Sequence, residues 1–216
     1  YGMTFSTALG ALFDPEVWGR PEMLLSFLLG QDTVARLGFS ASGELSTTTL
    51  ILWNIRLPRV IAGILVGINL SFSGSIFQAI TRNDLASPYT LGVGPGSGLA
   101  IWLVLVLFPT LGVHLPLAAS LGGAFAFLLV YAIAWHGGTS PVRLILAGVV
   151  VSAVIGSLQS GLFFMARDLS VVRDAAAWTV GSLTGVGWSQ VRLALPWTLL
   201  VVTIGFASTR YLDLIL

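Results

Sequence analysis

The fold is decided by residues 56–99, which read RLPRVIAGILVGINLSFSGSIFQAITRNDLASPYTLGVGPGSGL. Within them, residues 60–81 run for 22 positions without a charged side chain. A helix of that length, at about 1.5 Å per residue, measures roughly 33 Å and crosses a hydrocarbon core of about 30 Å. Residues 82–88, which follow, contain charged side chains and a proline. A glycine stands at every second position of the loop that follows: Gly92, Gly94, Gly96 and Gly98. The stretch predicts a membrane helix, a turn at the membrane face and a glycine-rich entry into a second helix.

The composition of the whole chain indicates a polytopic, all-α membrane protein. Mean hydropathy is +0.93, and charged residues make up only 9% of the sequence, against about 25% in soluble domains. The net charge of +1 gives no reason to expect a nucleic-acid partner. The chain has no cysteine, which excludes disulfides and thiolate metal sites.

Further apolar spans follow the first. Residues 85–142 contain 58 positions without Asp, Glu, Lys or Arg, which is too long for one helix, and two prolines and a glycine interrupt them at 108–116. We expect transmembrane helices at about 60–81, 91–108, 116–135, 144–166 and 193–209, and a short surface helix near 171–187. They form a single transmembrane domain over residues 1–216, with 1–59 outside the membrane and 60–216 as the bundle. The sequence is expected to be truncated at both ends.

Small residues repeat every fourth position in two of these spans. They are Gly63, Gly67, Ser71 and Ser75 in the first, and Gly148, Ser152, Gly156 and Ser160 in the fourth. Such a face lets another backbone approach closely. Three amides also lie within the spans, at Asn69, Gln78 and Gln159, and each needs a partner in a lipid environment. Helix packing is the simpler interpretation, and the lining of a transport pathway is the alternative.

The sequence gives no sign of a metal or cofactor site. His114 and His136 lie at the ends of different spans, and zinc sites usually take three or four protein ligands. The glycine-rich loop lacks both the G-x-G-x-x-G spacing and the preceding strand of a dinucleotide-binding fingerprint. None of the five spans contains Asp or Glu, which an intramembrane enzyme or a proton-coupled transporter would need.

Several motifs in order resemble the FecCD/BtuC-type permeases of type II ABC importers. The matching segments are Arg56-Leu57-Pro58-Arg59, Ser73-Gly74 with Gln78, Arg82-Asn83-Asp84-Leu85-Ala86-Ser87-Pro88, Leu91-Gly92-Val93, Leu144-Ile145-Leu146-Ala147-Gly148-Val149 and Trp178-Thr179-Val180-Gly181-Ser182-Leu183-Thr184-Gly185. The family usually has proline where Asp84 stands, so the local turn departs from its pattern. The resemblance extends over about residues 50–210.

The resemblance implies a function and a set of partners. Such permeases have ten helices, of which this chain is similar to the second to sixth. They act in the bacterial inner membrane as homodimers or paralogous heterodimers, with two cytoplasmic ATPase subunits and a periplasmic or lipoprotein substrate-binding protein. They import iron–siderophore complexes, haem or cobalamin by alternating access, without covalent chemistry or a cofactor of their own.

The resemblance also implies roles for particular residues. Arg56 and Arg59 match arginines that receive acidic groups of the binding protein; as an alternative, they anchor a helix end at the lipid headgroups. Thr139 and Ser140 match a narrow cytoplasmic gate; as an alternative, they form an ordinary turn with a helix N-cap. The fourth span, 144–166, is similar to the helix that lines the translocation path.

Orientation and cargo stay open at this point. Seven arginines lie on the side of residues 14–59 and three on the other, so the positive-inside rule places residues 14–59 in the cytoplasm. The family topology places them in the periplasm. An iron–siderophore is the favoured cargo because residues 86–92 read most like those of iron-uptake members. Haem and cobalamin are alternatives within the family, and a secondary transporter or an intramembrane enzyme is the rival class.

Overall fold

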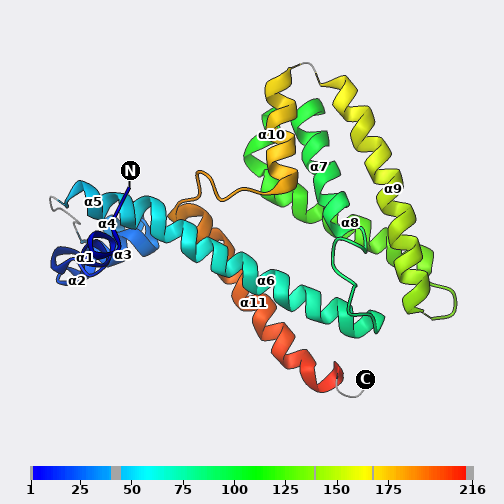
Figure 1. Ribbon diagram of the computed structural model, residues 1–216, viewed down its shortest axis with the longest axis horizontal. Helices are drawn as coiled ribbons and strands as arrows, with labels where there is room; N and C mark the ends of the chain where they lie inside the picture. The colour runs from blue at the N-terminus through cyan, green and yellow to red at the C-terminus, as the bar shows by residue number, and fades with distance from the viewer. Residues whose placement is uncertain (1, 40–44, 139, 167, 213–216) are drawn as a thin grey trace. The chain divides into compact units, whose positions relative to one another are not determined.

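The computed structural model describes residues 2–39, 45–138, 140–166 and 168–212, and within them it contains helices and loops but no strand. The helices follow one another as labelled in Figure 1. In chain order they are α1 Phe5–Leu12, α2 Pro15–Trp18, α3 Pro21–Leu29, α4 Gln31–Arg36, α5 Thr47–Ile51, the π-helical turn η1 Leu52–Arg56, α6 Leu57–Thr81, α7 Val93–Leu107, the 3₁₀ turn η2 Pro109–His114, α8 Leu115–Ala134, α9 Pro141–Met165, α10 Leu169–Val180 and α11 Trp188–Leu212.

Among the described residues, four helical segments are long and apolar enough to cross a membrane. They are Thr47–Thr81, Pro109–Ala134, Pro141–Met165 and Trp188–Ala207. The predicted span at 91–108 is also an apolar helix, but α7 has 15 residues. At about 1.5 Å per residue it measures roughly 22 Å, less than the hydrocarbon core. The prediction of an all-α, multi-pass membrane protein is confirmed.

Three predicted boundaries are wrong. The last span was expected to begin near residue 193, but α11 begins at Trp188. The first span was expected to begin near residue 60, but the helix is continuous from Thr47 to Thr81 and passes through Pro58. The surface helix was expected near 171–187, but α10 ends at Val180. Gly181 follows with φ +86°, a conformation that L side chains rarely adopt, and the chain continues as a loop to Trp188.

The chain divides into two compact units. One contains the residues up to Leu70 together with Leu183–Ser208, and the other contains Ser71–Ser182. The boundary falls within α6, so this helix contributes to both.

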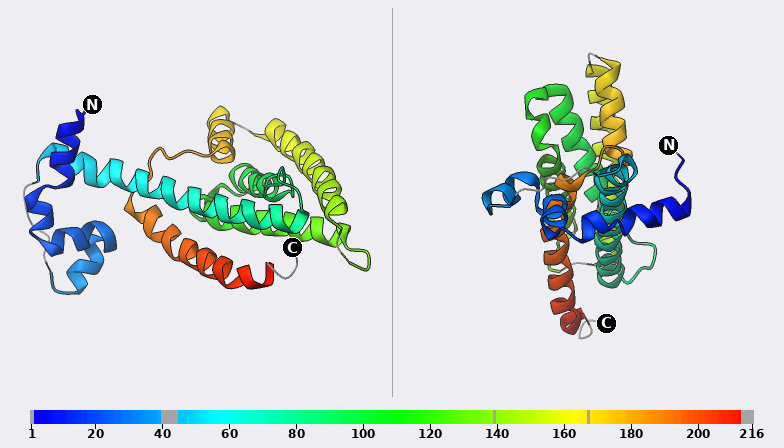
Figure 2. Two further views of the ribbon diagram at one scale, coloured as in Figure 1. Left: turned by 60° about the horizontal axis from the view of Figure 1, so that its bottom comes forward. Right: turned by 90° about the vertical axis from the view of Figure 1, so that its left-hand side faces the viewer.

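The second unit is a bundle of α7, α8, α9 and α10. The buried apolar residues of its core are Leu91, Ala126, Val130, Ala134, Leu144, Ala147, Val151 and Ile155. Figures 1 and 2 show α7 beside α8, with α10 against the same group of helices. Trp102, Leu162 and Ala175 form a separate buried cluster among α7, α9 and α10. A bundle with so little polar surface is suited to lipid surroundings.

The first unit joins short N-terminal helices to α11 and the first half of α6. Asp14 caps α2 through a hydrogen bond from the Glu16 amide, and its second oxygen accepts from Thr49 Oγ1 at 2.6 Å. This one carboxylate therefore links α2 to α5. The segment 14–57 carries many charges, yet the structure folds its described part into helices rather than leaving it extended.

Candidate functional site

Arg56 and Arg59 lie on either side of Pro58 in the continuous helix. A proline inside an α-helix lacks a donor and clashes with the carbonyl of the preceding turn. The π-turn η1 comes immediately before it, and there the Leu57 amide donates to Leu52 O, five residues back. This wider turn accommodates Pro58 without ending the helix. The two arginines therefore lie within a continuous helix, and the helix end expected at this position is wrong.

Both arginines are partly exposed and three residues apart, a spacing that puts them on neighbouring positions of one helix face. In the described part of the chain, Arg59 Nε is buried and has no hydrogen-bond partner. A buried donor without a partner is costly. The Nε atom is enclosed by the chain itself, so any carboxylate that approaches this face would meet the exposed part of the two guanidinium groups.

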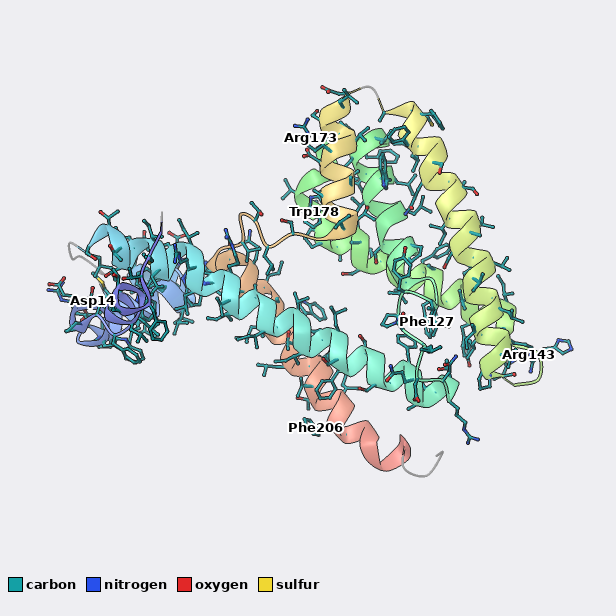
Figure 3. The ribbon with its side chains drawn as sticks, viewed as in Figure 1. Asp14, Phe127, Arg143, Arg173, Trp178 and Phe206 are labelled. Carbon is teal, nitrogen blue, oxygen red and sulfur yellow. The ribbon has the colours of Figure 1, made fainter. Side chains whose placement is uncertain are left out.

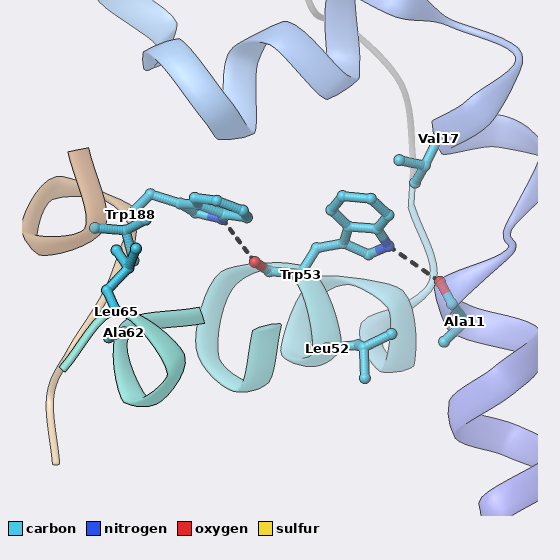
Figure 4. Packing of buried hydrophobic residues seen from close by; sticks show 8 residues of the cluster. Ala11, Val17, Leu52, Trp53, Ala62, Leu65 and Trp188 are labelled. Atoms are coloured by element: carbon cyan, nitrogen blue, oxygen red, sulfur yellow. Dashed lines mark hydrogen bonds between the residues drawn. The ribbon is translucent and has the colours of Figure 1, made fainter. Parts of the chain in front are cut away.

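Two tryptophans hold the π-turn in place. Trp53 O has lost its usual donors, because the Leu57 amide bonds to Leu52 O and Pro58 has no N–H. Trp188 Nε1 donates to Trp53 O at 2.7 Å, and Trp53 Nε1 donates to Ala11 O at 3.1 Å. Figure 4 shows both bonds inside the apolar cluster of the first unit. The turn that carries Arg56 thus depends on a residue 135 positions further along the chain.

Trp188→Phe is expected to destabilise the protein by about 1–3 kcal/mol, because it leaves the buried Trp53 carbonyl unsatisfied while keeping an aromatic ring in the cluster. Trp197→Phe is the matched control on the same helix, since Trp197 is 65% exposed. The free energies of unfolding of both variants can be measured by denaturant titration in detergent. Equal losses for the two variants would contradict this role of the indole N–H.

The predicted gate lies at the start of α9. Ser140 occupies the N-cap position with an extended backbone, but its side chain makes no capping hydrogen bond. Thr139 lies outside the described residues. Arg143, labelled in Figure 3, closes the preceding loop by donating to His136 O at 3.4 Å and to Gly138 O at 3.2 Å. An arginine of the first turn of α9 therefore shapes this loop, and the sequence reading did not assign it that role.

The four small residues of α9 have different surroundings. Gly148 is buried against Thr90 O and Leu91 Cα, so that an added Cβ would collide with backbone. Ser152 Oγ is buried and lacks a hydrogen-bond partner within the described chain. Around Gly156 an added Cβ would meet nothing within 4 Å, and Ser160 is exposed. The half of the face formed by Gly148 and Ser152 is thus packed against the chain, and the half formed by Gly156 and Ser160 is open.

Each of the three amides has a partner. Asn69 Nδ2 donates to Leu65 O at 2.8 Å and to Thr198 Oγ1 at 2.7 Å, which joins α6 to α11 within the first unit. Gln78 Nε2 donates to Asp84 O at 2.9 Å and so holds the turn after α6. Gln159 Nε2 donates to Pro95 O at 3.0 Å and joins α9 to α7. All four bonds are structural contacts within one chain.

The small face of α6 is mostly open. An added Cβ at Gly63 would lie 3.6 Å from Leu183 Cδ1, whereas one at Gly67 would meet nothing within 4 Å. Ser71 and Ser75 are exposed. Little of the described chain therefore packs against this face, so that lipid or another helix could cover it.

The glycine-rich loop combines a turn with close helix crossings. Gly92 is the N-cap of α7 with φ +82°, which favours glycine. A Cβ added at Gly94 would lie 2.5 Å from the Tyr89 ring. A Cβ added at Gly96 would lie 2.6 Å from Gly122 O, and one added at Gly98 would lie 2.8 Å from Gln159 Nε2. Gly96 also approaches Gly122 on α8 closely, since a Cβ added at Gly122 would lie 2.6 Å from Gly96 O. This approach was not predicted from the sequence.

An apolar groove of about 630 Å³ opens beside this crossing. It is lined by residues of α7, α8 and α9, including Leu103, Phe125, Leu129 and Val154. In the described residues, no group of three or more His, Cys, Asp or Glu side chains could hold a metal ion.

Comparison with known proteins places the chain in a family. The profile of the FecCD transport family matches residues 4–216. The achromobactin transport system permease protein CbrC of Dickeya dadantii (strain 3937) is 42% identical over 162 residues, which cover 74% of this chain and 46% of that protein. The Fe(3+)-citrate import system permease protein YfmE of Bacillus subtilis (strain 168) is 34% identical over 211 residues, which cover 97% of this chain and 57% of that protein.

The fold has a counterpart among solved structures. A structure described as an inward-facing conformation of a metal-chelate type ABC transporter matches with a TM-score of 0.69 and 25% identity, over 90% of this chain and 63% of that one. The chain spans about half the length of the curated relatives it matches. The match over residues 4–216 and the identity to these permeases show that the chain belongs to the FecCD transport family.

Proposed function

We propose that the chain is a permease subunit of an ABC importer that moves an iron–siderophore complex across the bacterial inner membrane. The observation that carries this proposal is the family match over residues 4–216, in a chain with five apolar helices. Relatives at 31–42% identity are named as permeases for ferric hydroxamate, achromobactin, ferric citrate and hemin. Siderophore and citrate chelates recur in these names, which favours a siderophore over haem or cobalamin as cargo.

The mechanism proposed is alternating access without covalent chemistry in this subunit. Helices α6, α7, α8, α9 and α11 contain no Asp or Glu. A proton-coupled transporter or an intramembrane enzyme would need a titratable group at membrane depth. The energy would then come from two ATPase subunits, and the path would lie between two permease copies.

The roles of individual residues are part of this proposal. Arg56 and Arg59 would receive carboxylates of a substrate-binding protein, which is supported by their partial exposure and by their spacing of three residues along one helix. Thr139 and Ser140 would form the cytoplasmic constriction. The open half of the α9 face, from Gly156 to Ser160, would face the path or the second copy, because nothing in the described chain packs closely on Gly156.

The test is uptake of ⁵⁵Fe-labelled chelates by cells that lack their own iron permeases. The protein is expressed with an ATPase and a binding protein encoded beside it, and hydroxamate, catecholate, citrate and haem cargoes are compared. We expect uptake of one siderophore class that requires the ATPase. Uptake that persists with a Walker-A-inactivated ATPase would favour the secondary transporter.

Membrane orientation can be tested separately, because the chain has no native cysteine. Val113, in η2, is 86% exposed, and His136, at the other end of α8, is also exposed. If residues 14–59 are periplasmic, Val113→Cys reacts in intact cells with a membrane-impermeant thiol reagent and His136→Cys reacts only after permeabilisation. The reverse pattern would support the arginine count and overturn the family topology.

A further inference from the structure

A polar pocket of about 300 Å³ lies in the first unit, and its lining does not include Arg56 or Arg59. Its wall is formed by α3, the start of α4, the α5–η1 segment and the first turns of α11. The polar residues that line it are Ser26, Gln31, Asn54 and Arg192. A volume of this size is at the lower end of the range for small-molecule sites.

The pocket carries one positive charge that no described lining residue balances. Arg192 Nη1 donates to Phe27 O at 3.2 Å, which fixes the guanidinium at the end of α3. Gly30 makes this position possible, because an added Cβ there would lie 3.3 Å from Arg192 Nη1. A guanidinium has several N–H donors, so donors remain beyond the one bonded to Phe27 O. None of the described lining residues is acidic.

The neighbouring polar groups complement this cation. Within the described residues, the Asn54 and Gln31 side chains are exposed and have no hydrogen-bond partner. Ser26 Oγ already donates to Met23 O at 2.7 Å. Two amides and a guanidinium that offer N–H donors to one space suit an anion with planar oxygens, and arginine binds carboxylates in a two-point geometry.

We propose that this pocket binds a carboxylate group, held by Arg192 and by the side-chain amides of Asn54 and Gln31. The occupant we infer is a small organic acid, because the volume of about 300 Å³ falls within the range of small-molecule sites. The site goes beyond the transport function, since it needs neither the ATPase nor the iron chelate in order to bind.

The test uses the protein in detergent micelles with ¹⁵N-labelled arginine side chains. The sequence has ten arginines, and Arg192→Lys assigns the Arg192 Nε–H signal. Succinate is the probe for a free acid, and N-acetyl-glutamate methylamide, whose only carboxylate is the side chain, is the probe for an acidic residue. Sodium chloride at matched ionic strength is the reference.

The Arg192 signal is expected to move saturably with succinate, whereas that of Arg36, an exposed arginine outside the pocket, stays in place. A stronger response to succinate than to the blocked glutamate supports a small organic acid, whereas a response to the blocked glutamate alone would overturn this occupant in favour of an acidic side chain. Asn54→Leu and Gln31→Leu each weaken binding by about tenfold, because each removes one donor to a charged group. These variants keep the Arg192–Phe27 bond. No saturable shift, a shift equal to that in chloride, or full affinity in both variants would overturn the proposal.

Discussion

Gly148→Leu is expected to destabilise the protein by about 3 kcal/mol or more, whereas Gly156→Leu, eight residues further along α9, is expected to leave the stability of the subunit within about 0.5 kcal/mol. At Gly148 the new side chain meets Thr90 O and Leu91 Cα, which are backbone atoms and cannot rotate away. Overpacking in a well-packed core typically costs about 1–3 kcal/mol, and a backbone obstacle places this case at the upper end. At Gly156 the space is open.

The measurement is the free energy of unfolding in detergent, and Leu158→Ala, at an exposed apolar position of α9, serves as a control for altered lipid contacts. Dimer formation is measured in the same samples by cross-linking. A Gly156→Leu variant that is stable but no longer dimerises would place this face against a second copy. Equal stability of the Gly148 and Gly156 variants would show that the close approach at Thr90 is not needed for folding.

Arg56→Glu combined with Arg59→Glu is expected to weaken binding of the substrate-binding protein by about 10- to 100-fold, equivalent to about 1.4–2.7 kcal/mol. Close charge pairs at protein interfaces have coupling energies of about 1.5–7 kcal/mol, and reversing both signs adds repulsion. The loss should be larger at low salt, where screening is weaker. Affinity is measured with immobilised binding protein and solubilised permease.

Arg36→Glu combined with Arg173→Glu is the matched control, because it reverses the same number of charges at exposed positions outside the pair. This control should bind nearly as well as the unmodified protein. Acid-to-arginine changes on the binding protein should partly restore binding to the Arg56–Arg59 variant. Unchanged affinity of that variant at low salt would remove the docking role.

The sequence predicted the apolar helices because their signal is local. Long uncharged runs at 60–81 and 144–166 need no knowledge of distant residues, and both are helical in the structure. The continuity of the helix through Pro58 was not predictable in this way. Proline is common at the first helical position, so residues 57–60 read as a helix start. The indole of Trp188, far along the chain, completes the π-turn instead.

In the candidate sites, too, local patterns were predictable from the sequence, and contacts between distant residues were not. A four-residue repeat of small side chains predicts a smooth face, but it does not say what covers that face. Gly148 and Gly156 belong to one repeat, yet only Gly148 has backbone against it. Gly122 was missed as the partner of Gly96 because their approach depends on how α7 crosses α8. Asn54 and Arg192 carried no motif, and they reach one pocket only through the path of the folded chain.

The unbroken helix from Thr47 to Thr81 has a mechanical consequence. Its 35 residues make a rod of about 52 Å, while the uncharged part from Val60 needs only about 33 Å to cross the hydrocarbon. The remaining segment, about 20 Å long, is more than the hydrocarbon requires, and it includes both arginines. Under the docking role proposed for Arg56 and Arg59, a small tilt of the part that crosses the hydrocarbon would displace the outer end of the helix, and the docked protein would move with it.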